Sequence, residues 1–70
     1  MLRNTKLAIL LREVAAFQLN HPEATEDDIF AGVAENIQGK YRSGWAIVLI
    51  SFLEALLPFI LEWLNEEEDE

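Results

Sequence analysis

Residues 45–64 of this 70-residue chain read WAIVLISFLEALLPFILEWL, an almost unbroken apolar run. A helix of about 20 residues crosses a hydrocarbon core of roughly 30 Å, because each residue adds about 1.5 Å to its length. The hydropathy of this segment lies in the range typical of transmembrane helices. The other residues are too few to surround such a helix, so we expect lipid or other subunits to cover it.

The rest of the chain predicts two further helices. The first, at about residues 4–19, contains no Pro or Gly and has apolar side chains at helical spacing. It ends ahead of Pro22, because the residue before a proline is disfavoured in the helical conformation. The second helix covers about residues 25–38, and the third covers about residues 43–65. The sequence therefore predicts an all-α fold of three helices, the third long and almost wholly apolar.

The second helix carries start and stop signals. Thr25, followed three residues later by Asp28, forms a capping box, in which each side chain bonds the other's backbone amide. Gly39 follows the last apolar position, so we expect it to end the helix in the usual C-terminal position. Gly32 lies inside the helix, where glycine costs about 1 kcal/mol relative to alanine. We therefore expect a neighbouring helix to approach closely at Gly32.

The charges are unevenly placed along the chain, whose formal net charge is −8. Residues 1–44 hold five basic and six acidic side chains, whereas residues 45–70 hold seven acidic side chains and no basic ones. Binding to nucleic acid needs a broad basic patch, so we expect no direct nucleic acid binding. If residues 45–64 span a membrane, Lys40 and Arg42 place the amino terminus in the cytoplasm. If not, the acidic tail at residues 66–70 solvates a soluble chain.

Size limits how this chain gains stability. Residues 1–70 have room for one small helical domain, ending in the acidic tail at residues 66–70. The chain has no Cys, which excludes disulfides and thiolate metal sites. Small domains without such supports usually gain stability from other subunits or from a membrane. We therefore expect the chain to bind itself as a homo-oligomer or to join a larger protein complex, with a lipid bilayer as the other candidate partner.

On a helical projection, almost all small and polar residues of the third helix share one arc of about 100°. This interaction stripe comprises Gly44, Ser51, Glu54, Ala55, Pro58 and Glu62. In a bilayer such a stripe packs helix against helix, while the large apolar residues face lipid. In water the stripe would instead face solvent, and the apolar surface would be buried against protein.

Glu54 has three open interpretations. Pro58 removes the helical hydrogen bond to the carbonyl of Glu54, which leaves a backbone acceptor beside a carboxyl group. A carboxyl group inside a membrane is a candidate site of transport or gating. It can instead fix the register between packed helices, or simply face solvent.

Residues near both ends of the apolar run are typical of membrane interfaces, where Trp and Tyr gather and basic residues flank the span. The candidate interface anchors are Lys40, Tyr41, Arg42, Trp45 and Trp63. The alternative is that both tryptophans are large core residues of a soluble protein.

The sequence lacks the residue clusters that carry catalysis. His21 is the only histidine, and without Cys or a second His a transition-metal site is not favoured. No Ser or Thr has a neighbouring histidine to act as a base. The acids at 26–28 lack the spacing of a calcium loop, and the scattered glycines form no phosphate-binding loop. We expect no enzyme activity, no cofactor and no metal.

Two functions fit these observations. The first is a small helical membrane protein with one spanning helix at 45–64, acting as a structural subunit or as an oligomeric, pore-forming component. The alternative is a soluble, cytoplasmic, acidic helical module for protein–protein interaction, which homo-oligomerises or caps a larger assembly. Its acidic surface would suit a basic partner.

Overall fold

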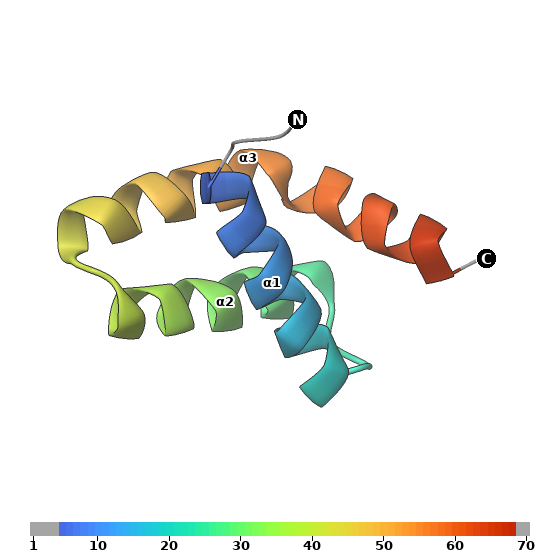
Figure 1. Ribbon diagram of the computed structural model, residues 1–70. Coiled ribbons are helices and arrows are strands. Elements are labelled where there is room, and N and C mark those ends of the chain that lie inside the picture. Colours follow the sequence, from blue (N-terminus) through green and yellow to red (C-terminus); the bar gives the residue numbers. More distant parts are fainter. Residues whose placement is uncertain (1–4, 69–70) are drawn as a thin grey trace.

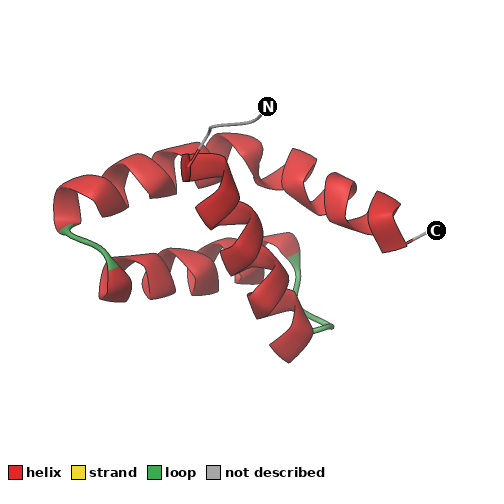
Figure 2. Ribbon diagram, viewed as in Figure 1, coloured by secondary structure: helices red, strands yellow, loops and turns green. Residues whose placement is uncertain are grey.

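The computed structural model describes residues 5–68 and has three helices: α1 (Thr5–Asn20), α2 (Glu26–Lys40) and α3 (Ser43–Glu68). Short loops join the helices, and the described residues contain no strand (Figure 2). The predicted all-α fold with a long apolar third helix is confirmed. The predicted start of the first helix, at residue 4, lies outside the described residues.

The three helices all contact one another. The first half of α3 lies beside α2 and runs antiparallel to it, because only Tyr41 and Arg42 join the two helices (Figure 1). Helix α1 crosses α2 and α3 (Figure 1). The second half of α3 extends beyond the end of α2 (Figure 1). The buried residues of α3 nevertheless extend from Ala46 to Ile60, so its cover reaches into the second half of the helix.

One apolar core lies between the helices, with side chains spaced three or four residues apart on each of them. Its members are Leu10 and Val14 of α1, Ile29, Val33 and Ile37 of α2, and Ala46, Leu49, Leu53, Leu57 and Ile60 of α3. This spacing keeps all the buried residues of a helix on one face. Burial of a large apolar side chain contributes about 1.5–3 kcal/mol, so the single face of α3 is the largest contributor to the core.

The predicted capping box at the start of α2 is confirmed. The amide of Asp28 donates to Thr25 Oγ1 at 3.2 Å, and the amide of Thr25 donates to Asp28 Oδ2 at 3.3 Å. The prediction that Gly39 ends the helix is wrong, because α2 continues to Lys40 and no glycine among the described residues has a positive φ. The Tyr41 amide donates to the Ile37 carbonyl at 3.0 Å, which satisfies the helix end without a left-handed glycine.

Helix α3 continues through Pro58 and reaches Glu68, three residues beyond the predicted end at 65. Pro58 is exposed on the surface of the helix. It has no amide hydrogen to donate to the Glu54 carbonyl, and such a loss bends a helix. Helix α3 bends along its length (Figure 1). Glutamate is a good helix former, which accounts for the extension into the acidic run.

The close approach predicted at Gly32 is confirmed. A Cβ atom at this position would clash with the ring of Phe17 from α1, whereas a Cβ at Gly39 would meet nothing within 4 Å. Gly32 therefore lets α1 and α2 pack closely through the Phe17 ring.

Two glycine substitutions test this contact. Relative to Gly39→Ala, Gly32→Ala is expected to lower the free energy of unfolding by about 1–3 kcal/mol, because both substitutions gain helix propensity and only Gly32→Ala overpacks the Phe17 contact. Gly39→Ala is the matched control, and it should raise stability by up to about 1 kcal/mol through helix propensity alone. Urea unfolding followed by circular dichroism measures both values. Equal stabilisation by the two substitutions would contradict the close contact.

Candidate functional site

The candidate site is the outer face of α3, which points away from the core. All members of the predicted interaction stripe are exposed and lie on this face: Gly44, Ser51, Glu54, Ala55, Pro58 and Glu62. The buried residues of α3 lie on the opposite side of the same helix. The helix thus brings the stripe together on one exposed surface.

Large apolar side chains lie beside this stripe and are also exposed. The exposed fractions are 64% for Ile47, 38% for Phe52, 53% for Phe59 and 42% for Trp63. Phe52, Phe59 and Trp63 are seven and four residues apart, so they lie on one flank of α3. Contiguous exposed apolar surface on a small protein typically marks a contact with a protein or a membrane.

A lysine of α1 lies over the amino-terminal part of this flank. The Lys6 ammonium lies 5.2 Å from the ring centroid of Trp45 and 5.8 Å from that of Phe52. Ammonium groups within about 6 Å of an aromatic face are attracted by the negative charge of the π system. Trp45 is accordingly half-buried, while Trp63 at the other end of the flank is exposed. The two candidate membrane anchors therefore have different surroundings.

Acidic and aromatic side chains alternate at the carboxyl end of the flank. We call Phe59, Glu62, Trp63 and Glu66 the aromatic–acidic patch; all four are exposed. Their spacing of three, four and seven residues makes them neighbours on one helical surface. Within the described part of the chain, no Lys or Arg lies over the ring of Phe59 or Trp63. The patch thus combines apolar surface with negative charge.

Glu54 lies near the amino end of α2. It lines a shallow hollow of about 240 Å³ together with Glu26, Asp27, Phe30 and Leu57. Its side chain is exposed, so the structure places it among other acids at the surface. No group of three or more His, Cys, Asp or Glu among the described residues is arranged to hold a metal ion.

The predicted anchors at 40–42 lie where α2 turns into α3. Arg42 is exposed and Tyr41 is half-buried against the core.

Lys40 binds Glu13 of α1, with 2.8 Å between Nζ and Oε2. Glu13 is buried, and its carboxylate is satisfied by this ammonium. The hydrogen bond to Glu13 and its negative charge raise the pKa of Lys40 above the ordinary value of 10.5. Sequence analysis missed this pair because 27 residues separate its members.

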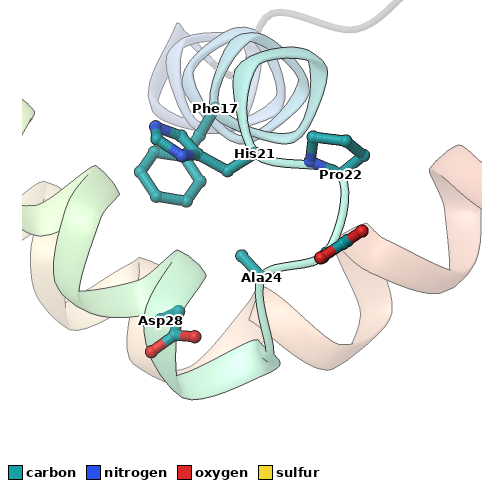
Figure 3. Close-up of a pocket in the computed structure, with 6 residues that line it drawn as sticks. Phe17, His21, Pro22, Ala24 and Asp28 are labelled. Atoms are coloured by element: carbon teal, nitrogen blue, oxygen red, sulfur yellow. The ribbon is translucent and has the colours of Figure 1, made fainter.

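A second hollow, of about 520 Å³, lies at the loop between α1 and α2, and Figure 3 shows the residues that line it. The ring of His21 stacks on Phe17 with 4.4 Å between centroids. The backbone amide of His21 donates to the Phe17 carbonyl and closes the last turn of α1. Asp28 is engaged in the capping box. The His21 amide and the Asp28 carboxylate therefore have structural partners, and His21 supports the end of α1.

The segment Ser43–Glu66 of α3 is long and apolar enough to cross a membrane, and 28% of its most apolar 18 residues are buried within the fold. A core helix of a soluble protein also meets this length and composition test. Comparison with known protein families, curated proteins and solved structures gives no match.

The ion pair between Lys40 and Glu13 predicts how stability depends on pH. Because the pKa of Lys40 is raised on folding, the pair contributes fully below pH 10.5 and is lost as pH rises through the higher pKa of the folded state. Lys40→Arg keeps a charge at those pH values. From neutral to strongly alkaline pH, the unfolding temperature of the wild type should therefore fall more steeply than that of Lys40→Arg. Parallel curves would contradict a stabilising pair.

Proposed function

We propose that this protein is a soluble helical interaction module. Helices α1 and α2 pack against the inner face of α3, which carries its core residues. The outer face binds a partner protein, so that the chain forms a homo-oligomer or caps a larger assembly. The observation that carries this proposal is the division of α3 into two faces. Leu49, Leu53 and Ile60 are fully buried, while Phe52, Phe59 and Trp63 remain exposed beside the stripe.

The packing of α2 favours a protein partner over a bilayer. Glu26 and Asp27 of α2 line the same hollow as Leu57, which lies inside the apolar segment of α3. If α3 spanned a membrane in this arrangement, both acids would lie at hydrocarbon depth, where each costs about 2.5 kcal/mol or more. Spanning would therefore require α1 and α2 to separate from α3. An interaction module needs no such rearrangement.

A spanning helix is the second candidate, supported by the length and hydropathy of Ser43–Glu66. In that arrangement Lys40 and Arg42 would place the amino terminus in the cytoplasm, and Trp45 and Trp63 would lie at the two interfaces. Helices α1 and α2 would rest on the membrane surface with their apolar faces in the headgroup region. The stripe would then join spanning helices into a structural or pore-forming oligomer.

Ala55→Arg distinguishes the two candidates, because position 55 is exposed in the packed fold and central in a spanning segment. The interaction module should keep its stability within about 0.5 kcal/mol, and both wild type and variant should enter the supernatant on carbonate extraction. A spanning helix would lose about 2.5 kcal/mol or more of insertion free energy.

The matched control is Ala31→Arg, at an exposed position of α2 outside the apolar segment. Wild-type protein that pellets with lipid, and is released by Ala55→Arg but not by Ala31→Arg, would contradict the proposed function.

A further inference from the structure

We propose that the aromatic–acidic patch of α3 binds a basic amphipathic helix of a partner protein. Lys or Arg side chains of that helix lie over the rings of Phe59 and Trp63 and pair with Glu62 and Glu66. Apolar side chains of the partner cover the remaining ring surface. This inference rests on the proposed function, because it requires the outer face of α3 to be in water.

The contact made by Lys6 indicates the chemistry of the partner. Its ammonium lies over Trp45 and Phe52, which share a flank of α3 with Phe59 and Trp63. Within one chain, the amino-terminal part of this flank therefore already holds a cation. The carboxyl-terminal part presents two more exposed rings of the same kind and lies where α3 extends beyond α2 (Figure 1). A cationic side chain from a partner extends the same arrangement.

The acids of the patch add a second attraction for a cation, beyond the attraction of the aromatic rings. Glu62 lies three residues from Phe59, and Glu66 lies three residues from Trp63, so each carboxylate neighbours a ring. A cation over either ring can therefore pair with a carboxylate while its alkyl chain covers apolar surface. The four patch positions span two helical turns, about 10 Å, which matches the spacing of side chains along one partner helix.

Charge argues for a basic partner rather than a second copy of this chain. Residues 45–70 contain seven acidic side chains and no basic ones, and the whole chain carries a net charge of −8. Two copies that met through the patch would bring acids against acids, which disfavours association. A basic helix removes that repulsion and covers the same apolar rings.

The test uses the full-length protein and two synthetic amphipathic helices of about 20 residues, long enough to fold on binding. One helix is built from Leu and Lys, and the other has Glu at every Lys position. Titration calorimetry should show binding of the Lys helix that weakens as salt is added, and no binding of the Glu helix.

Paired variants locate the binding surface. Glu62→Gln with Glu66→Gln, and separately Phe59→Ala with Trp63→Ala, should each weaken binding of the Lys helix about tenfold or more. Glu23→Gln with Glu35→Gln makes the same change in net charge at exposed positions outside the patch, and should alter binding by less than about twofold. Leu19→Ala, which truncates a side chain that is 84% exposed, is the apolar control. Circular dichroism checks that every variant keeps the wild-type helicity.

The outcomes separate this inference from the proposed function. Equal weakening by patch and control variants, or equal binding of the Lys and Glu helices, would overturn the basic-helix proposal. The same holds if the folded, soluble protein binds neither helix, and the interaction module would then remain supported. Protein recovered only in the membrane pellet would overturn both proposals.

Discussion

Helix α3 has more apolar surface than the other two helices can cover. Large apolar side chains occupy about 260° of its circumference, and α1 and α2 bury one face of it, along Leu49, Leu53 and Ile60. Among the described residues 5–68, no further helix lies on the opposite side of α3. The exposed rings of Phe59 and Trp63 are the direct consequence, and they make the outer face of α3 the candidate for partner binding.

The inner helices are held in place by contacts between residues that are distant in sequence. Gly32 admits the ring of Phe17, which sets how closely α1 and α2 approach. Lys40 neutralises the buried carboxylate of Glu13 and ties the end of α2 to α1. A buried charge without a partner strongly destabilises a fold, so this pair also favours one arrangement of the two helices. These contacts fix the cover on α3 and hence which of its residues remain exposed.

Local sequence patterns predicted the parts of this fold that depend on local physics. The helix count, the capping box at Thr25 and the close approach at Gly32 follow from periodicity, capping and propensity. Gly39 does not end α2 as its residue type predicts, because the helix continues to Lys40 and the Tyr41 amide donates to the Ile37 carbonyl. The partners of Lys6 and Glu13 depend on how the helices cross, which no local pattern contains. Periodicity separated the two faces of α3 but did not say whether protein or lipid covers each.

Side chains of α1 and α2, and not lipid, cover the inner face of α3. Methyl nuclear Overhauser spectroscopy of the protein in water tests this packing directly, with Leu, Ile and Val methyl groups labelled. We expect cross-peaks from Leu49, Leu53 and Ile60 of α3 to core methyl groups of α1 and α2, and we expect them to persist when lipid vesicles are added. Their absence in water, or their loss as α3 enters the vesicles, would contradict this account.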